Sequence, residues 1–317
     1  MGEVRIGTSG WSYPSGPGTW NGVFYPARRG GMRGATELEY YAEHFDTVEV
    51  NSSFYRLPDP AAAKKWVQQT PARFDFCVKL FQKFTHPGMY LKSAGARADG
   101  ESNPIPAVTP ADVDAFRRSV EPLASAGKLG ALLVQFPPSF RHGEDALEYV
   151  EWLLRSFSGC DAAVELRHRS WSDHQEAVIE LLKAHRAAWV QIDEPKFRFS
   201  ITQSRLPNLR SVYYMRLHGR NAEKWWTHEH PDERYNYLYS PGEVEGFADT
   251  VRQVRELVQK MYVFMNNHFA GKAVANAAAL RHAVGQPVPG EYAEEMLARY
   301  PFLRGIAARQ GGQGLFD

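Results

Sequence analysis

The amino-acid sequence predicts an α/β protein folded as a single (β/α)8 TIM barrel with extended loops on its C-terminal face. Two observations predict this fold. Short runs of β-forming residues recur along the whole chain, and helical patterns separate them, which is the order of elements in a parallel α/β protein. Eight such repeats within 317 residues favour a closed barrel over an open, doubly wound sheet.

The predicted strands have mostly apolar first halves and polar residues at their C-terminal ends. They cover residues 4–9, 47–54, 74–80, 130–136, 162–168, 187–193, 212–219 and 261–268. No Gly-rich dinucleotide fingerprint follows the first strand, and the chain has no other nucleotide-cofactor motif. A nucleotide-binding doubly wound sheet is therefore disfavoured.

The helices that follow the strands are recognised by their first residues. Capping boxes are predicted at Thr36–Glu39, Ser172–Gln175 and Ser240–Glu243. A capping side chain also precedes a proline at Asp59-Pro60 and Thr109-Pro110. A stripe of Val251, Val254, Val258 and Met261 predicts one helix that extends from Phe247 to Met261 and packs on the sheet.

Composition and charge set limits on domain organisation and partners. No linker divides the chain, so we expect one barrel domain over residues 1–305 and a flexible Gly-rich tail over 306–317. The net charge of +1 is not the large positive charge that is typical of many nucleic-acid binding proteins, although a local groove can still be basic. No apolar run approaches the roughly 20 residues of a membrane span, and no apolar signal segment precedes the first strand.

Cys77 and Cys160 are the only cysteines, too few for a disulfide framework or a cysteine-based zinc site. We expect both to be small buried side chains. Together with the missing membrane and signal segments, they predict a cytoplasmic protein without a membrane partner.

Long irregular segments follow four of the strands, at 8–35, 81–108, 194–211 and 219–239. Barrel enzymes build their active sites at the C-terminal face, from strand ends and the loops that follow them. The candidate catalytic residues at these ends are acids and imidazoles: Glu49, Glu165, Asp193, His218 and His268. The first four of these are also ligand types for a divalent metal, although no local metal motif is present and nearby arginines would compete for the carboxylates.

Cations, amides and aromatic rings share the same rim. The candidate substrate-binding residues are Trp11, Tyr13, Asn51, Tyr55, Lys79, Gln135, Arg167, Trp171, Arg216, Arg220, Asn266 and Asn267. The arginines and the lysine suit a phosphate or carboxylate group, and the rings suit a base or a sugar. Glu165 and Arg167 lie two apart on one strand face, so they can form a mutual ion pair, or Glu165 can pair with Arg216 across the barrel.

Seven motifs resemble one family in order along most of the chain, from about residue 4 to about residue 280. They are GTSGW (7–11), WNGVFYP (20–26), TVEVNSSFYRLP (47–58), LVQFPPSF (133–140), VELRHRSW (164–171), YMRLHGR (214–220) and FMNNHFAGKAVANA (264–277). These are similar to the domain of unknown function 72 family, a YecE-like group. The resemblance implies a TIM barrel and supplies no activity, because that of the family is not established.

The leading hypothesis for function is a hydrolase acting on a phosphate-containing substrate, such as a small phosphorylated ligand or nucleic acid, by acid/base or metal-assisted chemistry. One alternative is an acid/base enzyme for a sugar or sugar phosphate, and another is a binding scaffold without catalysis. Near the C-terminus, Gln313, Leu315 and Phe316 resemble the peptides with which bacterial repair proteins bind the sliding clamp, with one spacer residue fewer than usual. This apolar end can equally fold back on the barrel.

Overall fold

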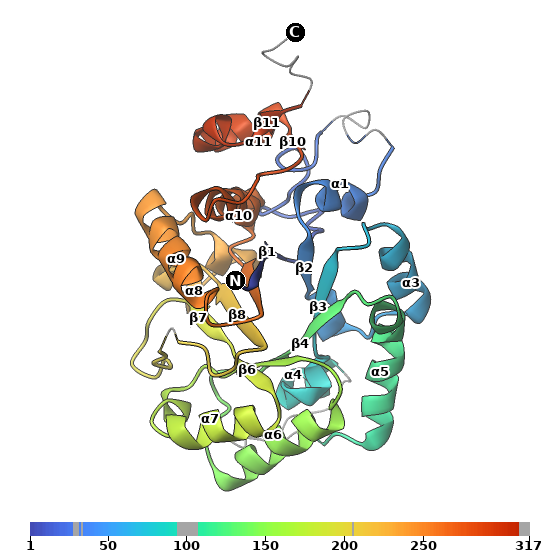
Figure 1. Cartoon of the computed structure of the whole chain (residues 1–317), viewed down its shortest axis with the longest axis vertical. Helices are drawn as coiled ribbons and strands as arrows, with labels where there is room; N and C mark the ends of the chain where they lie inside the picture. The colour runs from blue at the N-terminus through green and yellow to red at the C-terminus, as the bar shows by residue number, and fades with distance from the viewer. Residues whose placement is uncertain (28–31, 33, 94–106, 205, 311–317) are drawn as a thin grey trace.

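The computed structural model describes residues 1–27, 32, 34–93, 107–204 and 206–310. Nine strands form one parallel sheet in the order β6-β5-β4-β3-β2-β1-β9-β8-β7. They are β1 (Glu3–Ser9), β2 (Thr47–Val50), β3 (Asp75–Lys79), β4 (Leu129–Gln135), β5 (Ala162–Glu165), β6 (Ala187–Trp189), β7 (Gln191–Asp193), β8 (Val212–Leu217) and β9 (Lys260–Met265). Figure 1 shows the strands gathered at the centre, with helices around them.

The two edges of this sheet, β6 and β7, belong to one segment of the chain. Only Val190 separates them, and together they cover the sixth predicted strand. Because β6 pairs with β5 while β7 pairs with β8, the sheet returns to its starting segment. The Val190 N–H also donates to the Val164 carbonyl at 2.9 Å. The predicted α/β barrel is confirmed, and its sixth strand is interrupted.

We call residues 187–193, where the barrel closes, the seam. Side-chain amides from the segment after it complete its hydrogen bonds. Asn208 accepts from the Trp189 N–H at 2.9 Å and donates to the Ala187 carbonyl at 2.9 Å. Gln203 accepts from the Ile192 N–H at 3.2 Å and donates to the Val190 carbonyl at 2.7 Å. Two side chains therefore take the place of main-chain partners.

Seven helices of the described chain surround the strands (Figure 1). They are α1 (Glu37–His44), α3 (Pro60–Gln68), α5 (Pro110–Ser125), α6 (Glu144–Ser156), α7 (Gln175–Ala184), α9 (Pro241–Val254) and α10 (Lys272–Ala283). Shorter helices lie in the loops after strands: α2 (Ser52–Tyr55), α4 (Pro87–Ser93) and α8 (Ala222–Trp226). Beyond α10, α11 (Glu294–Arg299) lies between β10 (Glu291–Tyr292) and β11 (Ala308–Arg309), which pair with each other. None of the helices in the described ranges is both long and apolar enough to cross a bilayer.

Most predicted helix starts are confirmed. Thr36 and Ser240 form complete capping boxes, Thr109 forms one with Asp112, and Asp59 caps α3. The box at Ser172 is wrong: its hydroxyl donates to the Arg169 carbonyl, and α7 begins at Gln175 without a side-chain cap.

The predicted extent of the helix through Met261 is also wrong. The helix ends at Val254, and Met261 belongs to β9, where it pairs with Val4 of β1. Its place on the hydrophobic stripe therefore reflects burial in the sheet.

Several strands end earlier than predicted, because their polar ends turn into loops over the barrel. β2 stops at Val50, and the Ser53 hydroxyl lies 2.8 Å from the Val50 carbonyl and 2.6 Å from the Lys79 carbonyl. β5 stops at Glu165, so Arg167 lies in the loop that follows. These turns bring the polar side chains together above the strands.

The connection between β7 and β8 departs from the repeat of strand and helix, as the predicted irregular segment at 194–211 implies. Between β7 and β8, the described residues of the segment 194–211 contain no helix. A cavity of about 440 Å³ lies on this side of the barrel, lined in part by Ile192, Met215 and Phe247. The described chain therefore runs from β7 to β8 without a helix, although α7 packs against β6 at the seam.

The barrel interior changes from charged to apolar to charged along its axis. Arg5, Asp75 and Lys260 form ion pairs near the N-terminal ends of the strands. An apolar middle layer follows, made of Cys77, Ala131, Leu133, Ala163, Ala188, Val190, Val212, Tyr214, Tyr262 and Phe264. The candidate site lies above this layer, at the C-terminal ends.

Candidate functional site

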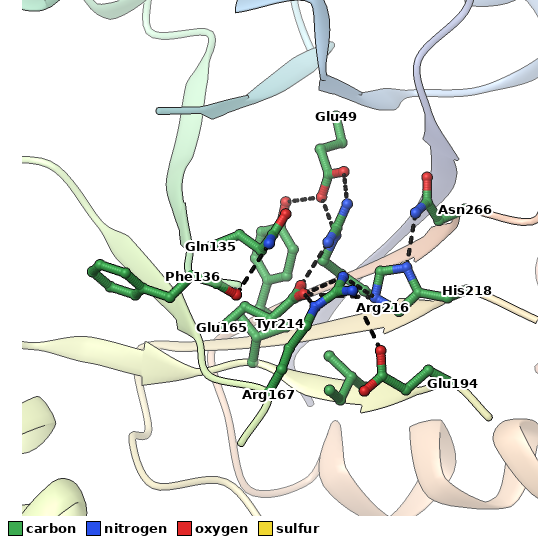
Figure 2. Close-up of polar contacts among 12 residues, drawn as sticks. Glu49, Gln135, Phe136, Glu165, Arg167, Glu194, Tyr214, Arg216, His218 and Asn266 are labelled. Carbon is green, nitrogen blue, oxygen red and sulfur yellow. Dashed lines mark hydrogen bonds and ion pairs between the residues drawn. The ribbon is translucent and has the colours of Figure 1, made fainter. Parts of the chain in front are cut away.

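Arg216 of β8 is the centre of the charged layer at the C-terminal ends. Its side chain is 2% exposed and contacts two fully buried carboxylates. Nε and Nη2 donate to Glu49 of β2 at 2.9 and 2.7 Å, and Nη1 donates to Glu165 of β5 at 2.6 Å. Figure 2 shows the guanidinium between the two carboxylates. Burial alone would raise the pKa of Glu165, but the charges of Arg216 and Arg167 hold this pKa well below its ordinary value.

Arg167 extends this arrangement towards the loops. It binds the other oxygen of Glu165 at 2.6 Å and lies 3.4 Å from Glu194. Three carboxylates and two guanidinium groups thus alternate across the barrel end (Figure 2), and we call them the charge chain: Glu49, Arg216, Glu165, Arg167 and Glu194. Because most of its charges are matched, it satisfies the requirement that buried ions be paired.

His218 contacts the charge chain as a neutral imidazole. Its burial, together with the charges of Arg167 and Arg216, lowers its pKa to about 3. Nδ1 lies 2.7 Å from the Asn266 amide nitrogen, and Nε2 lies 3.7 Å from Glu165. Arg167 Nη2 also lies 3.3 Å from Nε2, so the ring connects Asn266 to the charge chain.

Lys79 stands beside the charge chain without joining it. It makes no ion pair with a described residue, and its Nζ lies 4.0 Å from the centre of the Phe54 ring. Burial and the charges of Arg216 and Arg167 lower its pKa to about 7. Its amine is therefore present in both protonation states near neutral pH, which suits a group that moves protons.

A cavity of about 540 Å³ opens above the charge chain. It is lined by Tyr13, Asn51, Tyr55, Lys79, Met89, Gln135, Arg167, Arg216, Pro231, Asp232, Arg234, Tyr235, Asn266 and His268. Four of these are lysine or arginine and one is an acid, so the lining favours an anionic ligand.

Many of the sequence-predicted residues come together at this end of the barrel. Glu49, Glu165 and His218 lie in the buried layer around Arg216. The cavity is lined by His268 and by Tyr13, Asn51, Tyr55, Lys79, Gln135, Arg167, Arg216 and Asn266. Strands far apart in the sequence thus supply one site.

Other predicted residues lie apart from this cavity. Asp193 pairs with Arg220 at 2.7 Å and accepts from the Tyr239 hydroxyl, in a network of its own. Asn267 donates to the Tyr237 carbonyl and to Asn276. The last two are aromatic: Trp11 packs edge-on against Trp66, and Trp171 is buried with its indole donating to the Phe140 carbonyl.

Sequence reasoning missed several residues of the site. Glu194 follows a predicted strand end directly, so its position was a usable signal. Asp232, Arg234 and Tyr235 come from a short 3-10 helix, Pro231–Tyr235, inside a long loop. No periodic pattern marks this helix, because it is only five residues long.

The four candidate metal ligands do not form a cluster. Glu49 and Glu165 are bound to Arg216, and Asp193 is bound to Arg220. Within the described ranges, no three His, Cys, Asp or Glu side chains lie together in a way that could hold a metal ion. The donors present therefore do not fit a metal site as they are arranged.

Comparison with known proteins identifies the family. A family model described as "Protein of unknown function DUF72" matches residues 5–297. The chain belongs to the DUF72 family. The resemblance predicted from seven sequence motifs is confirmed, and it covers nearly the whole chain.

This DUF72 protein is similar to curated proteins of two bacteria. It is 28% identical to the UPF0759 protein YunF of Bacillus subtilis over 290 residues, which is 86% of this chain and 92% of YunF. It is 30% identical to the UPF0759 protein YecE of Escherichia coli K12 over 166 residues, which is 52% of this chain and 48% of YecE. Neither name states an activity.

Solved DUF72 structures have the same fold. A DUF72 protein of Thermotoga maritima is 33% identical with a TM-score of 0.73, covering 90% of this chain and all (100%) of that one. A DUF72 protein of Enterococcus faecalis is 23% identical with a TM-score of 0.74, covering 89% and 95% of the two chains, and shows the fold alone.

Proposed function

We propose that this DUF72 protein is an enzyme that hydrolyses a phosphate-containing substrate in the cavity above the charge chain. The observation that carries the proposal is Arg234, a cation that lines the cavity without an ion pair to any described residue, together with the unpaired amine of Lys79. Arg167 and Arg234 supply positive charge where a phosphate can bind.

The proposed chemistry uses Lys79 as the group that moves the proton. Its neutral amine accepts a proton from the water whose oxygen attacks phosphorus, and the protonated amine returns that proton to the leaving oxygen. Arg167 and Arg234 stabilise the charge on the phosphate oxygens. Glu49 and Glu165 hold Arg216 in place and take no part in proton transfer, because every one of their oxygens accepts from a guanidinium.

The test is the pH dependence of turnover on a panel of phosphomonoesters and phosphodiesters. Because the pKa of Lys79 is about 7 and the neutral amine is active, kcat/KM should rise about tenfold per pH unit below 7 and level off above it. Lys79→Gln should lose about 100-fold or more in kcat, and Lys79→Arg should fail equally, since a guanidinium keeps its proton. Lys64→Gln, an exposed lysine of α3, is the matched control. Full activity of Lys79→Gln would refute this role.

A nucleic-acid substrate is the second candidate, favoured by an aromatic cluster of which Phe197 lines the other cavity, the one of about 440 Å³. Phe197, Phe199 and Trp226 lie with ring centres 5.7 to 6.0 Å apart, and Trp226 is 55% exposed. Exposed rings beside cations suit unpaired bases. Oligonucleotide binding should then weaken steeply with salt, and Arg234→Gln should reduce the salt slope by about one.

The location of the enzyme in the cytoplasm is part of the proposal, and the two free thiols agree with a reducing compartment.

The predicted sliding-clamp contact through Gln313, Leu315 and Phe316 lies outside the described residues. It stays a proposal about partners, independent of the cavity.

A further inference from the structure

Two polar side chains in the cavity have no hydrogen-bond partner. Asn51 follows β2 and His268 follows β9, the two strands that flank β1. Asn51 Oδ1 and His268 Nδ1 are both shielded from solvent, and neither has a partner among the described residues. Buried polar atoms without partners are few in native proteins, and each calls for an explanation. Both residues line the cavity, so a ligand there could supply the partner.

His268 is held in position without using its own ring nitrogens. The His268 ring stacks on the Tyr13 ring, with 4.2 Å between ring centres and 11° between planes. The centre of the Tyr235 ring lies 4.8 Å from the centre of the His268 ring. The His268 carbonyl accepts from the Trp20 indole at 2.7 Å. The side chain is oriented by packing, which leaves its nitrogens available for recognition.

The backbone after His268 is constrained as well. Ala270 has a φ of 54°, in the left-handed region that is uncommon for a residue with a side chain. Its N–H donates to the Gly18 carbonyl at 2.9 Å, and its carbonyl accepts from the Tyr300 hydroxyl at 2.7 Å. Strained turns of this kind are found where the surroundings hold a functional side chain in place.

The chemistry of this side of the cavity differs from that of the cations. Burial lowers the pKa of His268 to about 3, so the ring is neutral and has one donor and one acceptor nitrogen. The Asn51 amide likewise donates and accepts. Hydroxyl groups do both as well, so this side matches a hydroxylated molecule, whereas a phosphate offers acceptors almost only.

We propose that Asn51 and His268 bind the hydroxyl groups of a phosphorylated sugar, whose phosphate lies against Lys79, Arg167 and Arg234. This inference rests on the proposed function, because it assumes that the cations bind phosphate. The volume of about 540 Å³ falls in the range of small-molecule sites. The Tyr13 and Tyr235 rings, which pack on His268, also line this cavity.

The test is calorimetric titration of the full chain with four probes: inorganic phosphate, pentyl phosphate, ribose 5-phosphate and glucose 6-phosphate. Pentyl phosphate has the charge and the carbon chain without the hydroxyl groups. We expect at least one sugar phosphate to bind about tenfold more tightly than pentyl phosphate, which is the effect of one or two added hydrogen bonds.

Variants separate the hydroxyl contacts from the phosphate contacts. Asn51→Ala and His268→Gln should each remove most of this tenfold preference and leave the affinity for inorganic phosphate within about twofold. Asn21→Ala and His282→Gln, which replace the same residue types at exposed positions, are the matched controls. Circular dichroism of each variant checks that it is folded, and Asn51→Asp is a second variant that keeps the shape of the side chain.

The outcomes separate the two proposals. Equal binding of pentyl phosphate and both sugar phosphates, with inorganic phosphate still bound, would overturn the sugar inference and leave the phosphate site standing. If none of the four probes binds at millimolar concentration, the proposed function fails together with the inference. Tighter binding of an oligonucleotide than of either sugar phosphate would also overturn the choice of a small sugar.

Discussion

Arg216 shows how one residue can organise a barrel end. It spans from β8 to carboxylates on β2 and β5, and it is almost completely buried. Without it, Glu49 would be left as an uncompensated buried charge, and Glu165 would keep only Arg167 as a partner. The same guanidinium helps to lower the pKa values of Lys79 and His218 by repelling added protons. Arg216 therefore links the stability of the fold to the chemistry of the cavity.

Replacing Arg216 with methionine should be strongly destabilising. Arg216→Met removes one partner from two buried ion pairs, and we expect a loss of about 3–5 kcal/mol in the free energy of unfolding, measured with urea. Arg155→Met is the control, because its pair with Glu151 is exposed and should contribute about 0–1 kcal/mol. Equal losses in the two variants would contradict the assignment of Arg216 as a buried bridge.

The histidines of the site predict how stability changes with pH. The pKa of His268 is about 3 in the folded chain and about 6.5 when unfolded, so between these values only the unfolded chain binds the proton. Stability should therefore rise with pH through this window and fall on acidification. From pH 7 to 5, His268 alone should contribute a loss of about 2 kcal/mol.

Urea unfolding of His268→Gln at both pH values measures this contribution. The variant should lose about 2 kcal/mol less than the wild type on acidification. His282→Gln, an exposed position, should follow the wild type. A His268→Gln variant with unchanged pH dependence would contradict the buried, neutral state of the ring.

Residue-level reasoning from sequence correctly placed Glu165 but could not choose its partners. Alternation along a strand puts Glu165 inside the barrel and Val164 and Leu166 among the helices, as found. Its partner Arg216 is 51 positions away and its partner Arg167 is two away, and both contacts exist. Which charges meet depends on the closure of the barrel, which no local pattern encodes.

At the level of elements, helix starts are encoded locally. Thr109 accepts from the Asp112 N–H, and Asp112 accepts from the Thr109 N–H, so the complete signal lies within four residues. Ser172 has the same sequence pattern, yet its hydroxyl accepts from the Thr202 N–H at 3.1 Å. A distant partner overrides the local preference there, and sequence reasoning had no access to it.

Removing the Thr109 cap should destabilise α5 and, with it, the whole barrel. Thr109→Ala should reduce the free energy of unfolding by about 1 kcal/mol, because two hydrogen bonds at the helix start depend on the hydroxyl. Thr109→Ser keeps the hydroxyl and should behave like the wild type. Thermal and urea unfolding of the three proteins would show the difference, and an unaffected Thr109→Ala would mean that the cap is not formed.

For the whole molecule, the closed barrel was predictable from the sequence, while the cavity was not. The repeat of strand and helix predicts a barrel, and the polar strand ends predict which face carries the site. The lining also needs Arg234 and Tyr235, which reach it only because a loop folds over the barrel end. The segment 194–211 between β7 and β8 was predicted to be irregular, and its described residues contain no helix.

The seam at residues 187–193 has a consequence for the motions of the protein. Its two strands are three residues long each, and side-chain amides of Gln203 and Asn208 hold part of its main chain. Such a region should open by local unfolding at lower free energy than the other strands. Hydrogen–deuterium exchange should therefore label the amides of Trp189 and Ile192 sooner than those of β1 or β9, and Asn208→Ala should accelerate the labelling of Trp189. The barrel wall would then open first at the seam, on the side away from α1 and α3 (Figure 1).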